Sequence, residues 1–230
     1  VNAFPVFWYM TIEYDMAFYG DDEGYDEQKN IREWMEVGRY FRAIDPMQRS
    51  VSLRTRTTRA SYRINLEEPD LIDFDSLQLG SCDSITIKEM ARVLPKALKT
   101  EPRLAVLAAD QCCEGLNEAN WANIQLHAFG AAILPGSSGY TYGANGIWQF
   151  NDNPYHFEPA PSGIAWGGPG WREAMVFPGA EQIARSKQVL ERYESHRIEP
   201  HPVWFIDQGC GPPAFAGGIS GGARFFYLPF

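Results

Sequence analysis

The sequence predicts an α/β protein of the (β/α) barrel type. Apolar runs of strand length alternate along the chain with amphipathic helical patterns, which is typical of parallel strands joined by crossover helices. No glycine-rich dinucleotide-binding fingerprint follows any expected strand, which favours a barrel over a doubly wound sheet. With 230 residues, of which 45% are hydrophobic, the chain can bury a core of domain size.

The first half of the chain contains three expected strands and one expected helix. Residues 4–12 are a continuous apolar and aromatic run, which is typical of a strand buried on both faces. Residues 29–44 place apolar side chains at helical spacing, and the Asp-Pro pair at 45–46 ends this helix. Short strands are predicted within residues 49–55 and 71–79.

The second half continues the alternation. A Thr-x-x-Glu capping box opens a helix over residues 86–98, which Pro95 should interrupt or end. Residues 103–110 predict a buried strand, a helix follows from about 119 to 134, and residues 138–143 predict one more strand. A last amphipathic helix is expected at residues 180–193, entered through Pro178-Gly179.

The remaining segments set the limits of the predicted domains. Residues 144–170 form a long loop rich in Asn, Pro, Gly and Trp, and loops of this length are usually functional. Because only five strands are expected, we predict that residues 1–202 hold roughly the carboxyl-terminal five of the eight units of a TIM barrel. Residues 203–230 are predicted to be a linker and the first strand of a following β-sandwich domain.

Composition excludes several classes of protein. A net charge of −9 and a pI near 5.0 argue against a duplex nucleic acid partner, and no apolar run is long enough to span a membrane. The four cysteines lack metal-binding spacing and the four histidines are scattered, so we expect buried thiols and neither metal nor cofactor. Gly218 to Gly222 match the GxSxG pattern, but no histidine follows Ser220, so we predict a glycine-rich linker followed by a strand. Oligomeric state is left open.

Candidate catalytic residues follow from the barrel geometry. Active sites of such barrels lie at the carboxyl ends of the strands, which selects Glu13, Arg54 and the segments 78–81, 110–114 and 140–149. Two carboxylates across a barrel mouth, ringed by Trp and Tyr, are the minimal equipment for glycoside hydrolysis. Taken singly, each carboxylate also fits a solvated or helix-capping role.

Two other features of the predicted site have alternative interpretations. Either Trp148 or Tyr142 fits a plug for the barrel as well as a sugar platform. Arg54 belongs to a cluster of arginines that fits a solvated basic strip, and the sharper alternative pairs Arg54 with the carboxylate of an acidic sugar.

One segment resembles a known family. Residues 139–149, GYTYGANGIWQ, resemble the G-H-T-Y-G-A-N-G-I-W-Q signature of the apiosidase-like glycoside hydrolases, long catalogued as a domain of unknown function. The resemblance covers essentially the whole chain. Supporting stretches lie at residues 71–78, 114–115, 171–175, 178–180 and 199–202.

The resemblance implies a TIM barrel of the retaining two-carboxylate superfamily. In that superfamily the acid/base ends the fourth barrel strand and the nucleophile ends the seventh, positions that the motifs assign to Glu13 and Asp110. It also implies plant cell-wall glycans as substrates, in particular the apiose-containing side chains of pectin, and export to the periplasm or beyond.

The chain departs from the family pattern at several positions. The family usually has Glu at Asp110, Tyr at Cys113, and His at Arg54, Ser81 and Tyr140. Because aspartate is one methylene shorter than glutamate, the carboxylate of Asp110 is withdrawn by roughly 1.5 Å, and a misplacement of about 1 Å can lower the rate about a hundredfold. Glu114 is a fallback carboxylate that lies beyond the strand end, where it could orient the sugar.

The leading hypothesis is therefore a retaining glycoside hydrolase with Glu13 as general acid/base and Asp110 as nucleophile. The alternative is a non-catalytic carbohydrate-binding relative, or an inactive fragment of a longer glycosidase. The residues predicted to bind the sugar are Trp8, Arg54, Gln78, Tyr140, Tyr142, Asn145, Trp148, Gln149 and Trp166.

Overall fold

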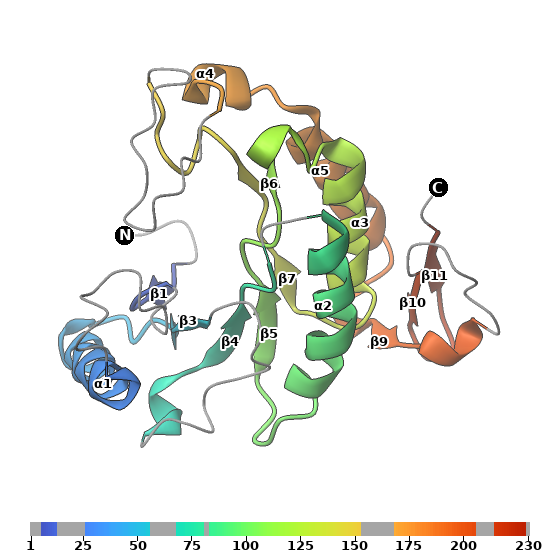
Figure 1. Ribbon diagram of the computed structural model, residues 1–230. Coiled ribbons are helices and arrows are strands. Elements are labelled where there is room, and N and C mark those ends of the chain that lie inside the picture. Colours follow the sequence, from blue (N-terminus) through green and yellow to red (C-terminus); the bar gives the residue numbers. More distant parts are fainter. Residues whose placement is uncertain are drawn as a thin grey trace.

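A parallel sheet organises the computed structural model, which describes residues 6–12, 26–55, 68–80, 83–152, 168–205 and 214–228 (Figure 1). Its strands are β1 (Trp8–Tyr9), β2 (Val51–Ser52), β3 (Arg54–Thr55), β4 (Phe74–Leu77), β5 (Ala105–Ala108) and β7 (Gly139–Tyr140). The hydrogen-bonded order is β3–β4–β5–β7, and β1 pairs with β2. All of these pairs are parallel.

β2 and β3 are two parts of one extended run that is interrupted at Leu53. On one side β2 pairs with β1, and beyond the interruption the Arg54 N–H donates to the Thr11 carbonyl at 3.3 Å. On the other side β3 pairs with β4. The described strands are thus neighbours in sequence order, which is the arrangement of consecutive (β/α) units.

Helices alternate with the strands along the chain, and the first three of them pack against the sheet, while the last packs on the third. They are α1 (Glu27–Ile44), α2 (Asp83–Ala97), α3 (Ala122–Ile133), α4 (Trp171–Ala174) and α5 (Pro178–Glu191), with short 3₁₀ helices at Pro69–Leu71, Leu116–Glu118, Ser195–Arg197 and Pro202–Trp204. The carboxylate of Asp26 caps α1 by accepting the Lys29 N–H at 3.0 Å. Within the described part of the chain, no helix has the length and apolarity needed to cross a bilayer.

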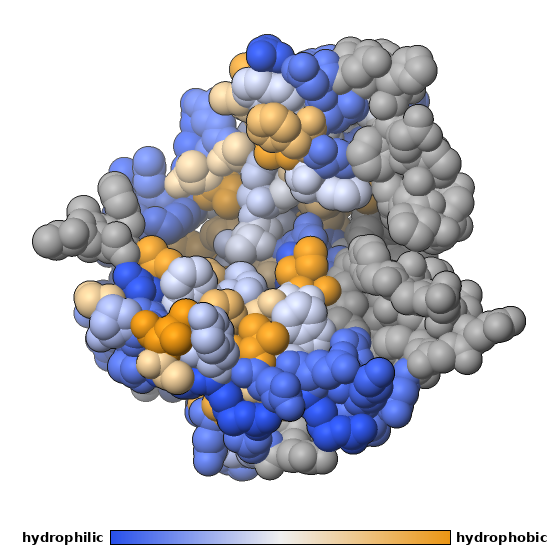
Figure 2. Space-filling model, turned by 90° about the vertical axis from the view of Figure 1, so that its left-hand side faces the viewer, coloured by the Kyte–Doolittle hydropathy of each residue, from blue (hydrophilic) through white to orange (hydrophobic). Residues whose placement is uncertain are grey.

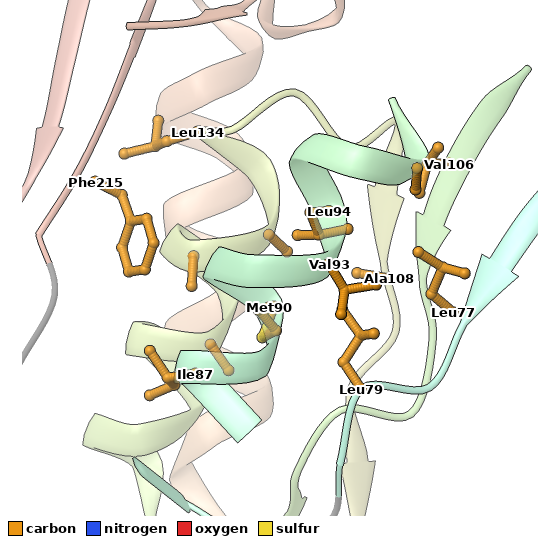
Figure 3. Packing of buried hydrophobic residues seen from close by; sticks show 14 of the residues in the cluster. Leu77, Leu79, Ile87, Met90, Val93, Leu94, Val106, Ala108, Leu134 and Phe215 are labelled. Atoms are coloured by element: carbon orange, nitrogen blue, oxygen red, sulfur yellow. The ribbon is translucent and has the colours of Figure 1, made fainter. Parts of the chain in front are cut away.

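Two apolar clusters fill the space between sheet and helices. In the larger one, Leu77 of β4 and Val106 of β5 lie on the side of the sheet that faces Leu94 of α2 (Figure 3). The smaller one joins β1 and β2 to α1 through Met10, Ile31, Met35, Val51, Leu53 and Ile72. Each fully buried aliphatic side chain contributes about 1.5–3 kcal/mol, so these clusters fix the strands that carry the site.

A second, shorter ladder begins where the main sheet ends. β6 (Cys113–Glu114) pairs in parallel with β8 (Gly143–Ala144), with Cys113 opposite Gly143 and Glu114 opposite Ala144. β6 follows β5 and β8 follows β7 along the chain, so this ladder extends the β5–β7 pair beyond the carboxyl end of the sheet.

A small antiparallel sheet packs against α3 on the side where His127 and Gly130 lie (Figure 1). It consists of β9 (Glu199–Pro200), β10 (Phe215–Gly218) and β11 (Arg224–Tyr227), with β10 in the middle. Phe215 is buried in the larger core cluster, and the Tyr227 ring stacks on His127 of α3 with 5.2 Å between ring centroids. The predicted boundary at residues 202 and 203 falls between two strands of this sheet, and the division into two domains stays a prediction.

Most expected elements are confirmed, although within residues 6–12 only Trp8–Tyr9 form the first expected strand, and three further differences follow. The helix expected from residue 86 begins at Asp83. Pro95 lies inside this helix and does not end it, because Pro95 and Ala91 are exposed and water can bond the Ala91 carbonyl that Pro95 leaves without a donor. The strand expected at 138–143 is split into β7 and β8, because its partner changes from β5 to β6. The glycine-rich segment around Ser220 is a hairpin turn between β10 and β11, so no nucleophile elbow forms.

Gly130 tests how closely the small sheet packs on α3. An added Cβ there would lie 2.8 Å and 2.9 Å from Cγ and Cδ2 of Tyr227. We expect Gly130→Ala to lower the melting temperature by a few degrees, because overpacking costs about 1–3 kcal/mol and exceeds the gain of about 1 kcal/mol in helix propensity. In a Tyr227→Ala background the same substitution should be neutral or stabilising. An equal loss in both backgrounds would show that the ring contact is not the cause.

Candidate active site

The carboxyl end of β5 carries a carboxylate on a left-handed backbone. Asp110 lies two residues beyond β5 and has a φ of 55°, a conformation that non-glycine residues seldom adopt. Its N–H donates to Thr141 Oγ1 at 2.7 Å, so the segment after β7 holds this turn in place. Backbone conformations of this kind concentrate at functional sites.

Both oxygens of the Asp110 carboxylate have partners. Oδ2 forms an ion pair with Arg54 Nη2 at 3.0 Å, and Oδ1 accepts a hydrogen bond from the thiol of Cys113, with Sγ 3.4 Å away. The Arg54 side chain is 13% exposed and that of Asp110 is 31% exposed. The pair therefore lies at the boundary between core and solvent, where it fixes geometry more than it adds stability.

The charge of Arg54 also acts on a buried pair of hydroxyl groups on β1 and β4. Tyr9 accepts a hydrogen bond from Ser76 Oγ at 3.0 Å, and its pKa is raised by burial against the opposing effects of this bond and of the Arg54 charge. Arg54 Nε is buried and finds no acceptor among the residues that the structure describes. A buried donor of this kind is costly unless a ligand supplies the acceptor.

The thiol beside Asp110 stays protonated. Burial, the negative charge of Asp110 and the hydrogen bond to it raise the pKa of Cys113 well above its ordinary value. Because only the thiolate is a good nucleophile, Cys113 is a hydrogen-bond donor here. Cys112 and Cys113 are buried thiols, which confirms the expectation for these two residues, whereas Cys82 and Cys210 lie outside the described residues.

Glu114 lies four residues beyond Asp110 and turns inward. Its side chain is completely buried, and its two oxygens accept the Gly179 N–H at 3.2 and 3.0 Å. Oε2 also accepts the Tyr142 hydroxyl at 2.6 Å. Burial, this hydrogen bond and the charge of Glu114 raise the pKa of Tyr142, so the phenol keeps its proton.

The two predicted hydroxyl-binding amides are bonded to each other. Gln149 Nε2 donates to Asn145 Oδ1, and Gln149 Oε1 accepts the Gly146 N–H at 2.5 Å. Asn145 is buried, and its backbone N–H donates to the Glu114 carbonyl at 2.8 Å. These amides shape the loop after β8 and join it to β6.

Two of the predicted aromatic residues pack against helices, and two lie in the segments that follow β7. Trp8 faces α1, where its ring stacks on Phe41 at 5.4 Å and its Nε1 donates to Asp45 at 2.9 Å. Tyr140 packs edge-on against Phe129 of α3, on the helix-facing side, and burial raises its pKa strongly. Trp148 is half exposed, and Tyr142 is partly buried.

Of the predicted site residues, the structure thus joins Arg54 to Asp110 and Tyr142 to Glu114, and the Cys113 thiol next to Glu114 in the chain contacts Asp110. Gln78 is buried at the end of β4. Glu13 and Trp166 lie outside the described residues. Figure 2 views the molecule from the side of α1 and α4. It shows a hollow between the region around α1 and the region around α4, with apolar residues on either side of the hollow.

The contacts of three residues at the site were not predicted from the sequence. Thr141 and Cys113 lie within the segments selected at the strand ends, but nothing in the sequence indicates that Thr141 accepts the Asp110 N–H or that the Cys113 thiol donates to Asp110. Tyr9 lies on the opposite face of β1 from Trp8 and Met10, which pack toward α1, and an apolar run buried on both faces does not indicate which residues point which way.

Comparison with known proteins gives two similarities. A family model described as "Apiosidase-like, catalytic domain" matches residues 3–196. A crystal structure of a glycoside hydrolase family 5 protein from Bacteroides vulgatus ATCC 8482 superposes with a TM-score of 0.65 at 18% identity, over 84% of this chain and 44% of that chain. This chain thus spans less than half of that structure, and the likeness shows an α/β fold of the TIM-barrel class. No curated protein matches the sequence.

The raised pKa of Cys113 predicts a loss of stability at alkaline pH. Above its ordinary value of 9.0 the unfolded thiol releases its proton while the folded thiol keeps it, so the unfolded state binds fewer protons and the free energy of unfolding falls as pH rises. We expect this contribution to approach about 1.4 kcal/mol per pH unit above pH 9, and Cys113→Ser to remove it. Urea unfolding at pH 8, 9 and 10 measures the slopes. Equal slopes in the two proteins would contradict the assignment.

Proposed function

The chain belongs to the apiosidase-like catalytic-domain family, and this membership supports a function as a glycoside hydrolase. We propose that it cleaves pectin-type glycans of plant cell walls with retention of anomeric configuration. The observation that carries the proposal is the Asp110 carboxylate, held on a left-handed turn at a strand end between Arg54 and Cys113. Carboxylates at the carboxyl ends of barrel strands are the groups that glycosidases use.

In the proposed mechanism Asp110 is the nucleophile and Glu13 the general acid/base. Asp110 attacks the anomeric carbon while Glu13 protonates the departing glycosidic oxygen, which gives a covalent glycosyl ester on Asp110. Glu13, now a carboxylate, then removes a proton from water, which attacks the anomeric carbon and releases Asp110. The products are the free sugar and the shortened glycan.

Two observations support Asp110 over Glu114 as the nucleophile. Glu114 is completely buried and both its oxygens accept hydrogen bonds from Gly179, whereas Asp110 is about one-third exposed. Within Asp110, the one hydrogen bond that Oδ1 accepts from the described residues comes from a thiol, which is a weak donor. We assign the attack to Oδ1, while Oδ2 stays on Arg54.

The substrate class draws its support from the remaining predicted residues. Tyr142 and Trp148 retain partly exposed rings that suit stacking on a sugar. Arg54 Nε is a buried donor with no acceptor in the described part of the chain, which suits an oxygen of an acidic sugar such as those of pectin. Roles in sugar binding for Trp8, Gln78, Tyr140, Asn145, Gln149 and Trp166 stay predictions from the sequence.

Hydrolysis of 4-nitrophenyl glycosides and pectin oligosaccharides tests the proposal. We expect Asp110→Asn to lower kcat by about 10⁴-fold or more and Glu13→Gln by about 10²–10⁴-fold. Asp152→Asn is the matched control, because Asp152 forms an exposed ion pair with Arg172, and it should leave kcat unchanged. NMR of the first product should show the anomer of the substrate. An inverted product, or full activity of Asp110→Asn, would contradict the mechanism.

A second candidate is a non-catalytic carbohydrate-binding protein. It draws support from the engagement of both Asp110 oxygens and from the side chain at this position, one methylene shorter than the usual glutamate. Isothermal titration with pectin oligosaccharides separates the two functions. Binding by the unmodified protein without detectable turnover would favour this candidate over the hydrolase.

A further inference from the structure

The buried carboxylate of Glu114 has no part in the proposed chemistry, yet both of its oxygens accept hydrogen bonds within the protein. It lies on β6, one residue beyond the Cys113 thiol that contacts Asp110. An ionised carboxylate inside a protein is costly unless its oxygens accept hydrogen bonds, and both oxygens of Glu114 accept them. Its partners are therefore informative about its role.

The first partner is the beginning of α5. Gly179 is the second residue of this helix, and N–H groups of a first helical turn have no acceptor inside the helix. Glu114 accepts this N–H, and its negative charge meets the positive end of the helix dipole. The absence of a side chain permits the contact, since a Cβ on Gly179 would collide with Glu114 Oε2.

The second partner is Tyr142, which lies just before β8. Its hydroxyl proton is committed to Glu114 Oε2 at 2.6 Å. The phenol oxygen then has lone pairs, and no proton, to offer to a ligand. The backbone of the same segment is fixed as well, because the Asn145 N–H donates to the Glu114 carbonyl at 2.8 Å and β8 pairs with β6.

We propose that Glu114 is a positioning residue for the substrate, which holds Tyr142 against the start of α5 so that the phenol oxygen accepts a hydrogen bond from a sugar hydroxyl. The inference rests on the proposed function, because it presumes that Tyr142 contacts the sugar. It gives Glu114 a role distinct from that of the nucleophile. It also explains why one segment carries two carboxylates that face different partners.

A double-mutant cycle tests this role. We expect Tyr142→Phe and Glu114→Gln each to raise KM about tenfold with little change in kcat, since each disturbs one hydrogen bond to the sugar. The double variant should be no worse than Tyr142→Phe alone, because Glu114 acts through Tyr142. Glu181→Gln is the matched control, since Glu181 lies in the first turn of the same helix and forms an exposed pair with Arg185. It should leave KM unchanged.

The outcomes separate this inference from the proposed function. An active protein whose two substitutions have independent, multiplicative effects overturns the positioning role alone. The Glu114→Ala variant gives a second outcome. If its kcat falls about 10⁴-fold and azide restores turnover with formation of a glycosyl azide, Glu114 is the nucleophile, and the positioning role is overturned as well. If the unmodified protein binds sugars without turnover, the same variants are compared by their Kd for the sugar in place of KM. If it neither binds nor cleaves them, both proposals fail.

Folding is checked by thermal melting of every variant. Should Glu114→Gln not fold, Gly179→Ala provides a second route, because its methyl group displaces the same carboxylate and should raise KM through Tyr142. In a Tyr142→Phe background that rise should vanish. A rise that persists without the hydroxyl would overturn the inference.

Discussion

The left-handed turn at Asp110 is the constraint on which the geometry of the site depends. Up to Ala108 the chain is a barrel strand bonded to β4 and β7. At Asp110 it changes direction, and the next residues form β6, which pairs with β8 in place of β7. Without this turn, Cys113 and Glu114 would not lie beside the segment that contains Thr141 and Tyr142.

The carboxylates in this turn and after it, Asp110 and Glu114, illustrate different ways to hold a negative charge. Asp110 meets a guanidinium at the edge of solvent, so the charge can approach a ligand. Glu114 meets a helix end and a phenol in full burial, so the charge is satisfied within the protein. The first arrangement suits chemistry, and the second suits a rigid support.

Alternation of strands and helices could be predicted from the sequence because buried parallel strands leave uninterrupted apolar runs, as at residues 103–110. The limits of α2 could not, because tolerance of Pro95 depends on which side of the helix faces water. Strand-end reasoning selected Arg54 and Asp110, and the structure joins them. It could not tell that Trp8 and Tyr140 face helices, since a strand buried on both faces has no polar side to set the register.

The contact of the small antiparallel sheet with α3 bears on how the protein could be divided. A chain ending at residue 202 would keep β9 but lose β10, the neighbour to which β9 is bonded. It would also uncover the side of α3 that Phe215 and Tyr227 shield. Unpaired strand edges and bare apolar faces favour self-association, so the last residues of the chain contribute to solubility as well as to the core.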